Sequence, residues 1–583
     1  MHLKQARNKK TGRTYLSIVQ SYRDKEKGYS RAKTIEKIGY LDELQKKYDD
    51  PIDHFKNLVA EKNAASLLET SESTIKFNKG QILEKGTSNR KNYGYIVILK
   101  ILTELGLERF LINRKQSTKL EYSTNSIMKL LIISRILSPG SKKRAFEEKE
   151  KYFDFEGNIN FDLNCIYRSL SHFSALAKDM QLLIHDRINK CYGRKTNLVY
   201  YDITNYYFEI DKEDELRKKG YSKENRKSPI VQLGLSMDGE GIPISYELFP
   251  GNESEKLHLR PMISELVRKY DTGKIIAVAD SAQNTGNNIY YLDQAKQGYI
   301  FSQSIAGGNA EFKGYVTSES GYVWFGEKYK RKSRICRREI SVEFVRGKDT
   351  FKKKVLVDQR QIVFYSEKYA KRAKEKREAT IKKAYHIINN PGAYTSATSY
   401  GALKYVKNVE VDKKTGEIKK SKGQPLFDFK KLQEEEKYDG YYAIITNVFN
   451  EETGSVDFDD DAIIRIYRGL WKIEDCFRVS KSDLETRPVF LSRRDRIESH
   501  FLICFISLVV MRLIQKKTNN SISAEKLIEA INKVSCSLEE VNLFLFDHRC
   551  EVTDSLGEAF GLDFTKKRMT RSEIKKNLGI AKK

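Results

Sequence analysis

The sequence has few cysteines and no paired cysteine motif. Seven cysteines are scattered over 583 residues, and no two form a CxxC pair. This arrangement makes a zinc finger or a disulfide framework unlikely to be the organising feature, and it suits a reducing cytoplasm. We therefore expect a cytoplasmic protein whose fold is held by ordinary packing.

Long hydrophobic runs are also missing. The N-terminus, MHLKQARNKK, is basic and has no apolar segment of the kind found in a signal peptide. The longest apolar run, Phe501 to Val510, is about half the length of a membrane span and is soon followed by Arg512. We interpret it as a buried helix and expect no membrane partner.

Positive charge is abundant instead. The formal net charge is +27, which favours a polyanionic partner such as nucleic acid, although solvated lysines alone give the same balance. Hydrophobic residues make up 39% of the chain, as in a globular protein. Its length suggests about three or four domains.

The order of the patterns predicts several regions. Residues 1–90 are expected to form a small basic β/α module, with strands at 14–20 and 29–38 and a helix at 51–68, which either binds DNA or is simply solvated. Residues 91–195 show helical spacing and predict a helical domain, either a DNA contact or a scaffold. Residues 516–583 are expected to form a helical C-terminal region that includes Leu538–Phe546.

The middle of the chain predicts an α/β catalytic core in two parts. Over 196–309, three consecutive strands are followed by a helix, a strand, a helix and a strand, an order that suits an RNase H-like sheet. Short strands among basic clusters at 310–436 predict a β-rich insertion, with a helix near 366–390. The core pattern resumes over 437–515.

Residues 463–481, IIRIYRGLWKIEDCFRVSK, are predicted to form one amphipathic helix with two stripes. At about 100° per residue, one stripe is apolar and the neighbouring stripe carries one acid among cations and aromatics. The members of the second stripe are Tyr467, Trp471, Glu474, Arg478 and Lys481. The simpler interpretation is a surface helix with i,i+4 pairs such as Glu474–Arg478.

Three carboxylates stand out against this background. Asp202 interrupts an apolar strand, Asp280 ends another, and Glu474 lies on the helix just described. A single buried acid can cap a helix or pair with a cation, but three gathered by one sheet suit hard cations such as Mg²⁺ or Mn²⁺. Two such ions can promote in-line displacement at a phosphodiester.

The chain resembles the DDE transposases of bacterial insertion sequences that carry the signature Y-(2)-R-(3)-E-(6)-K. Tyr467, Glu474 and Lys481 fall on that spacing, while the arginine position is Leu470. Arg468 and Arg478 are the nearby candidates for the missing arginine. Three further stretches also resemble the family: YYDITNYYFE around Asp202, LFPGNESE at 248–255, and VADSAQNT around Asp280.

This resemblance implies an RNase H-like core with a β-rich insertion between the second Asp and the Glu. It implies that Asp202, Asp280 and Glu474 bind the metal, two Mg²⁺ or Mn²⁺ ions in the family's manner, and that Tyr467 and Lys481 contact DNA near the cleaved end. Arg478 is a further phosphate contact, and Trp471 either stacks on a base or packs in the core.

The implied activity is cleavage at the terminal inverted repeats of a mobile element, followed by attack of a 3′-hydroxyl on target DNA. A homodimer is expected, because two ends must be paired. Two alternatives stay open at this point. One is a relative that binds element ends without catalysis, and the other is a metal-dependent nuclease without strand transfer.

Overall fold

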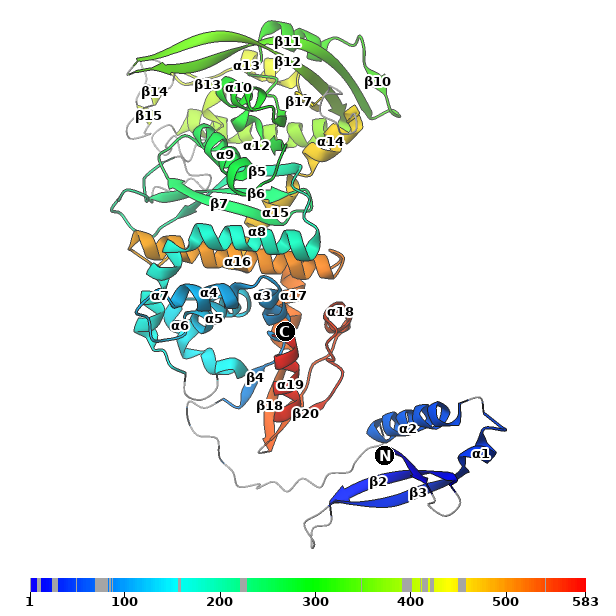
Figure 1. Cartoon of the computed structure of the whole chain (residues 1–583). Coiled ribbons are helices and arrows are strands. Elements are labelled where there is room, and N and C mark those ends of the chain that lie inside the picture. The colour runs from blue at the N-terminus through cyan, green and yellow to red at the C-terminus, as the bar shows by residue number, and fades with distance from the viewer. Residues whose placement is uncertain are drawn as a thin grey trace. The chain divides into compact units, whose positions relative to one another are not determined.

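The structure, a computed structural model, divides into two compact units, residues 1–87 and 88–583 (Figure 1). It describes residues 2–7, 12–23, 30–48, 50–68, 82, 85, 88–155, 159–220, 228–347, 349–390, 401–408, 410–411, 418–419, 424–448, 458–540 and 542–582. Each unit is described by itself.

The first unit is a three-stranded antiparallel sheet with two helices. Its strands are β1 (His2–Arg7), β2 (Thr14–Arg23) and β3 (Ser30–Tyr40), in that order, and its helices are α1 (Leu41–Leu44) and α2 (Pro51–Leu68). The buried side chains Leu16, Ile18 and Val19 come from the central strand, and Val59 comes from α2. Two strands and α2 agree with the sequence prediction, whereas the polar β1 was not predicted.

The second unit is built around one nine-stranded mixed sheet, which confirms the α/β class. One half of this sheet contains β7, β6, β5, β8 and β9, in that spatial order. β6 runs antiparallel to both β7 and β5, while β8 and β9 run parallel to β5. Their bounds are β5 Leu198–Tyr207, β6 Ile230–Asp238, β7 Pro243–Pro250, β8 Ile276–Ala279 and β9 Gly298–Ser302.

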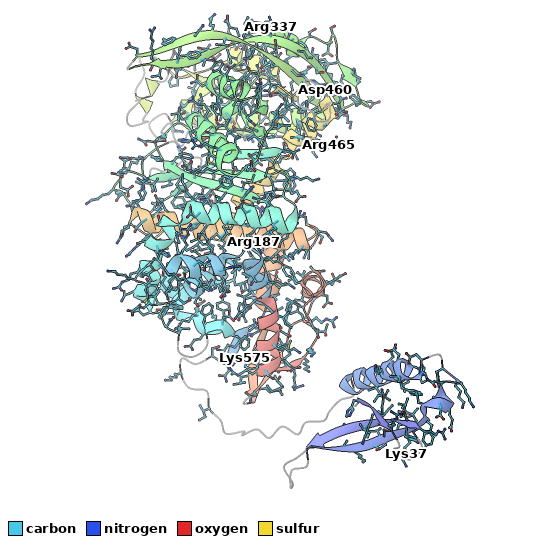
Figure 2. The ribbon with its side chains drawn as sticks, in the orientation of Figure 1. Lys37, Arg187, Arg337, Asp460, Arg465 and Lys575 are labelled. Atoms are coloured by element: carbon cyan, nitrogen blue, oxygen red, sulfur yellow. The ribbon has the colours of Figure 1, made fainter. Side chains whose placement is uncertain are left out.

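The other half of the sheet comes mostly from the expected insertion. β11 (Tyr329–Arg346) and β12 (Asp349–Ser366) form a hairpin of two 18-residue strands, drawn as long green arrows in Figure 1. β12 pairs with β17 (Tyr441–Thr446), and β17 pairs with β9, so the hairpin extends the core sheet. Arg337 projects from the outer side of this hairpin (Figure 2).

Smaller elements complete the insertion. The helix expected near 366–390 is α12 (Glu367–Asn389). The remaining helices and strands are α11 Ala310–Thr317, β10 Val323–Trp324, β13 Val406–Lys407, β14 Glu410–Val411, β15 Ile418–Lys419, β16 Leu426–Phe427 and α13 Phe429–Glu436. The short strands expected in this region are in part the long strands β11 and β12, which are paired with each other along their whole length.

Helices cover both faces of the core sheet, as alternation along β5 requires. Val199, Tyr201 and Ile203 pack with α9 (Leu259–Lys269) and α10 (Gly286–Gln294). Tyr200 and Tyr206 belong to the opposite core, which includes residues of α14 (Asp460–Arg468), α15 (Trp471–Arg478) and α16 (Arg494–Lys517).

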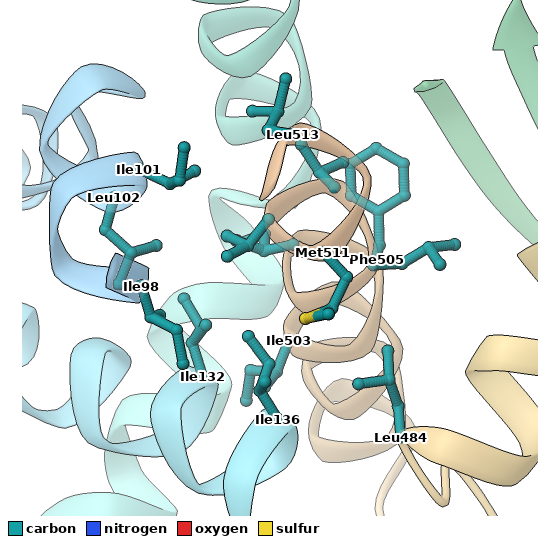
Figure 3. Packing of buried hydrophobic residues seen from close by; sticks show 14 of the residues in the cluster. Ile98, Ile101, Leu102, Ile132, Ile136, Leu484, Ile503, Phe505, Met511 and Leu513 are labelled. Atoms are coloured by element: carbon teal, nitrogen blue, oxygen red, sulfur yellow. The ribbon is translucent and has the colours of Figure 1, made fainter. Parts of the chain in front are cut away.

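The helix α16 is buried for almost its whole length. It is apolar and long enough to cross a membrane, yet 89% of its most apolar window is buried inside the protein. Ile503, Phe505 and Met511 of α16 all belong to the main core: Ile503 faces α5, whereas the Phe505 ring lies on the other side of the helix, 5.0 Å from the Tyr246 ring of β7 (Figure 3). This confirms the buried helix predicted for Phe501–Val510.

The helical region between residues 96 and 192 packs on the other side of α16. The Ser123 side chain caps the start of α5, and Leu176 separates α7 from α8. The bounds are α3 Ile96–Glu104, α4 Leu107–Lys115, α5 Thr124–Leu137, α6 Lys142–Glu147, α7 Leu163–Ala175 and α8 Ala177–Tyr192.

The C-terminal region is mixed, and the helix predicted over Leu538–Phe546 is wrong. That segment forms β18 (Ser535–Glu540) and β19 (Leu543–Phe546) of a four-stranded sheet with β4 (Arg90–Asn92) and β20 (Arg568–Thr570). Pairing with these distant strands decided its structure. Helices α17 (Ala524–Lys533), α18 (Glu551–Phe560) and α19 (Arg571–Ala581) flank the sheet.

Candidate active site

Asp202 and Asp280 lie on neighbouring parallel strands. Tyr200 of β5 is in register with Val278 of β8, and continuing that register by two residues sets Asp202 opposite Asp280. Adjacent strands are about 4.8 Å apart. On this extrapolation the two residues would share one level of the sheet, just after β8 ends.

Two hydrogen bonds tie the segment that carries Glu474 to β5. The Tyr200 hydroxyl donates to the Ile466 carbonyl over 2.9 Å, and Tyr206 and Ser480 share a hydroxyl hydrogen bond of 2.9 Å. From Ile466 to Ser480 the chain advances fourteen residues, about 21 Å at the helical rise, and from Tyr200 to Tyr206 it advances six strand residues, about 20 Å. The two segments therefore run side by side over the same distance. By this measure Glu474 lies beside the stretch of β5 from Asp202 to Thr204.

The predicted single helix over 463–481 is wrong in one respect, because it is interrupted at Gly469 and Leu470. A Cβ added at Gly469 would lie 1.9 Å from the Tyr200 hydroxyl oxygen, so only glycine allows this close approach. The last turn then widens into a π-helix over Val479–Asp483, which contains Lys481. Such π turns are frequent at functional sites.

Tyr467 lies close to two of the three acids. Burial raises its pKa, and the nearby Asp280 and Glu474 carboxylates raise it further, against a hydrogen bond with Ser302 at the end of β9. Because Tyr467 interacts electrostatically with both carboxylates, the end of β8, the end of β9 and α15 meet around it.

The backbone after Asp280 is held by a set of amide side chains. Asp280 Oδ1 accepts from the Ala282 N–H over 2.9 Å, Asn284 Nδ2 donates to the Ser302 carbonyl, and Gln283 Nε2 donates to the Glu255 carbonyl. The GNESE and DSAQNT stretches therefore pack against each other, which gives both a positioning role at the site.

The donor set matches the chemistry of a divalent cation. Asp280 and Glu474 are exposed, and neither forms an ion pair with a residue that the structure describes. Oxygen donors of this kind suit Mg²⁺ or Mn²⁺. Within the described ranges no three acidic, His or Cys side chains are already gathered tightly enough to hold a metal ion, so the triad remains a prediction.

The predicted DNA-contacting residues lie along the same helix but differ in surroundings. Trp471 is 60% exposed, and the Lys481 ammonium lies 5.4 Å from the centre of the Tyr206 ring. Arg478 donates to Asp475 over 2.9 Å and lies 3.3 Å from Asp483, so it faces these two acids and does not pair with Glu474.

The sequence did not reveal a pocket beside this helix. The pocket has a volume of 610 Å³ and lies between the turn at 239–242, α15, the end of α16 and residues 520–524. Asp475 on its wall pairs with Arg512 over 2.8 Å as well as with Arg478. Asp475 directly follows Glu474 in the sequence, but no local sequence signal connects Asp475 to a residue on α16.

A second missed feature is a chain of buried polar groups under the π turn. Ser480 Oγ bonds to both the Tyr206 hydroxyl and Thr486 Oγ1, each over 2.9 Å. The Thr486 carbonyl lies 2.8 Å from His500 Nε2, and His500 Nδ1 lies 3.3 Å from Lys142 Nζ. These groups tie the turn that carries Lys481 to α6 and α16.

Two protein-family models match the chain. The model described as the transposase DDE domain matches residues 207–510, and the model described as the N-terminal domain of IS1634 family transposases matches residues 2–71. The first covers more than half of the chain, which therefore belongs to the DDE transposases, enzymes that cleave and join DNA with divalent metal ions.

The N-terminal match narrows the assignment: the chain is an insertion-sequence transposase whose first unit is similar to that of IS1634 family members. Asp280 and Glu474 lie inside the DDE match, while Asp202 precedes it by a few residues. None of the curated proteins compared with the chain matches it.

Solved structures of other transposases show only distant similarity. The piggyBac transposase synaptic complex with hairpin DNA has a TM-score of 0.34 at 8% identity, with 84% of this chain and 85% of that chain covered. A Mos1 transposase paired-end complex with the left transposon end has a TM-score of 0.14 at 10% identity, covering 41% and 65%. The Mos1 mariner paired-end complex with Mn has a TM-score of 0.13 at 12% identity, covering 31% and 60%.

Proposed function

We propose that this transposase has an RNase H-like core in which Asp202, Asp280 and Glu474 bind two divalent ions, Mg²⁺ or Mn²⁺. The observation that supports the proposal is the pairing of β5 with β8, together with the hydrogen bonds that tie Ile466 and Ser480 to Tyr200 and Tyr206 of β5. The order of three antiparallel strands followed by two parallel ones supports the RNase H-like assignment.

The acids hold the ions, and the residues around them orient DNA. When bound, the ions supply the positive charge that in-line displacement at a phosphodiester requires. Tyr467 presents a hydroxyl next to Asp280 and Glu474, while Lys481 supplies a cation from the π turn. Both suit contacts with phosphates on either side of the bond that is cut.

Trp471 and Arg478 extend this surface. The exposed indole of Trp471 offers a face on which a base can stack. The signature arginine is absent, since its position is Leu470, and Arg478 takes its place. Arg478 contacts a phosphate by giving up its ion pair with Asp475 or Asp483.

The substrates are the terminal inverted repeats of the element and a target DNA. Pairing two ends requires two catalytic cores, so the working form is a homodimer on DNA. The protein acts in the cytoplasm, where its cysteines stay reduced.

The test is cleavage of DNA that carries the element ends. Asp202→Asn, Asp280→Asn and Glu474→Gln should each lower Mg²⁺-dependent nicking by about a hundredfold or more, with end binding retained. Asp475→Asn, one residue along the same helix, is the matched control and should stay within about tenfold of wild type. Wild-type nicking in any of the first three variants contradicts the assignment.

The same assay separates the alternatives. Clear end binding by the wild type without any Mg²⁺-dependent nicking would identify a relative that only binds DNA. Nicking without joining of pre-cleaved ends to a target would identify a nuclease that lacks strand transfer.

A further inference from the structure

The helix α12 presents a strongly cationic face. Its 23 residues contain eight lysines and arginines and three glutamates, and its inward side buries Ala384 and Ile387. Of the eight cations only Arg377 forms an ion pair with a described residue. The seven others are all exposed: Lys368, Lys371, Arg372, Lys374, Lys376, Lys382 and Lys383.

The outer face of the β11–β12 hairpin, in the same insertion, is different. Its three exposed cations each pair across the strands with an acid: Arg337 with Asp358 over 3.1 Å, Lys354 with Glu339 over 2.7 Å, and Lys352 with Glu343 over 3.4 Å. Compared with this face, α12 carries exposed cations that lack an ion pair with any described residue. Glu375 and Glu378 are spaced i,i+4 from lysines of α12, yet neither carboxylate lies within ion-pair distance of a described lysine.

The start of α12 is fixed beside the candidate active site. The Tyr369 ring lies 4.9 Å from the Tyr442 ring of β17, and the Arg377 guanidinium donates to Asp439, just before that strand, over 2.5 Å. β17 pairs with β9, whose end holds Ser302 next to Tyr467. The N–H of Gln303, which follows Ser302, donates to the Ala443 carbonyl, next to Tyr442, over 2.8 Å.

We propose that the exposed face of α12 binds the sugar-phosphate backbone of the duplex DNA that leads into the site of Asp202, Asp280 and Glu474. Twenty-three helical residues extend about 34 Å, which matches about ten base pairs of B-DNA. Lysines along this length neutralise phosphates without reading sequence. This inference rests on the proposed function, because it assigns α12 to the DNA on which that site acts.

The experiment compares two triple variants with the same change in charge. Lys368, Lys371 and Lys382 lie within about 60° of arc on α12 and are replaced together by Gln. The control replaces Arg337, Lys352 and Lys354, the paired cations of the hairpin, by Gln. Affinity for a 30-base-pair duplex (about three helical turns) without element sequence is measured against NaCl concentration, and melting curves confirm that both variants are folded.

For the α12 variant, the slope of log K against log[NaCl] should become shallower by about 2 to 3, because each lost phosphate contact contributes about 0.9. The control should change the slope by less than about 0.5. Equal slopes in the two variants would overturn the proposal. A single Lys382→Glu variant should weaken binding in the same direction, and unchanged affinity there would count against it as well.

Two further arms separate the causes of failure. Wild-type protein without Mg²⁺-dependent nicking contradicts the proposed function, whereas normal nicking with an unchanged slope in the α12 variant contradicts only this inference. If flotation with phosphatidylglycerol vesicles is lost in the α12 variant while its DNA slope is unchanged, the face serves an anionic membrane and the inference fails.

Discussion

At the scale of single residues, Lys142 is the most unusual ionisable group. It is 6% exposed, and its Nζ donates to His500 Nδ1, since His500 Nε2 donates to the Thr486 carbonyl. Burial and, to a smaller extent, the neighbouring Arg135 lower the pKa of Lys142 to about 7, and burial also lowers the pKa of His500 well below its usual value. Among the described residues, no carboxylate forms an ion pair with Lys142, His500 or Arg135, and Arg135 donates only to backbone carbonyls.

This environment predicts a stability that depends on pH. Folded Lys142 loses its proton above about pH 7, whereas the unfolded chain keeps it until about 10.5. The unfolded state binds more protons in that interval, so stability rises with pH from 7 towards 10.5. Lys142→Met should therefore stabilise the protein by about 1–4 kcal/mol at pH 6 and by much less near pH 10.

Urea unfolding at several pH values checks this prediction. Lys143→Met is the control, because Lys143 is exposed beside Glu147 and should give a small difference that is the same at each pH. A Lys142→Met effect of one size at pH 6 and pH 10 would show that the charge of Lys142 plays no part.

At the scale of elements, Gly469 decides how the helix that carries Glu474 meets the sheet. Gly469→Ala would force its Cβ against the buried Tyr200 hydroxyl, which is already bonded to the Ile466 carbonyl. We expect a loss of about 1–3 kcal/mol in unfolding free energy and slower cleavage, because α15 would shift away from β5.

The matched control for this variant is Gly579→Ala. Gly579 lies in α19, and no atom would come within 4 Å of the new Cβ. That substitution should be neutral or gain up to about 1 kcal/mol from helix propensity. Wild-type stability and cleavage in Gly469→Ala would mean that the junction adapts without moving Glu474.

Local patterns predicted most core elements, and the exceptions have physical causes. The periodicity of residues 124–137 is enough to define α5, and apolar runs locate β5, β6, β8 and β9. The break at Gly469 could not be foreseen, because it depends on a tyrosine of β5 far away in the sequence. Likewise β1 is polar and owes its structure to pairing with β2.

The candidate site was predictable in part. Acids that interrupt or end apolar strands are visible in the sequence, so Asp202 and Asp280 could be named as candidates, and the helix supplied Glu474. What the sequence could not give is the partner of each charge. The pairing of Arg478 with Asp475 and Asp483, and of Asp475 with Arg512, depends on how α15 and α16 pack.

At the scale of the whole molecule, the two units have separate cores. The main hydrophobic cluster begins at Tyr93, and the buried apolar residues of the first unit include Leu16, Ile18 and Val19 of β2. A fragment of residues 88–583 should therefore melt within about 3 °C of the full chain's main transition.

The same fragment tests what the first unit contributes. Since residues 2–71 match the N-terminal domain of IS1634 family transposases, we expect the fragment to lose its preference for element ends over scrambled DNA while keeping salt-sensitive binding. Competition binding with the two DNAs measures this preference. An unchanged preference would locate end recognition in residues 88–583.

The place of β17 between β12 and β9 limits how the chain can be shortened. β17 has the sequence YYAIIT, and its Ala443, Ile444 and Ile445 are buried. Deleting the hairpin would leave one whole side of this apolar strand without hydrogen-bond partners, and such a bare edge recruits other chains into aggregates. A trimmed enzyme that stays soluble must therefore keep β12, even if the rest of the insertion is removed.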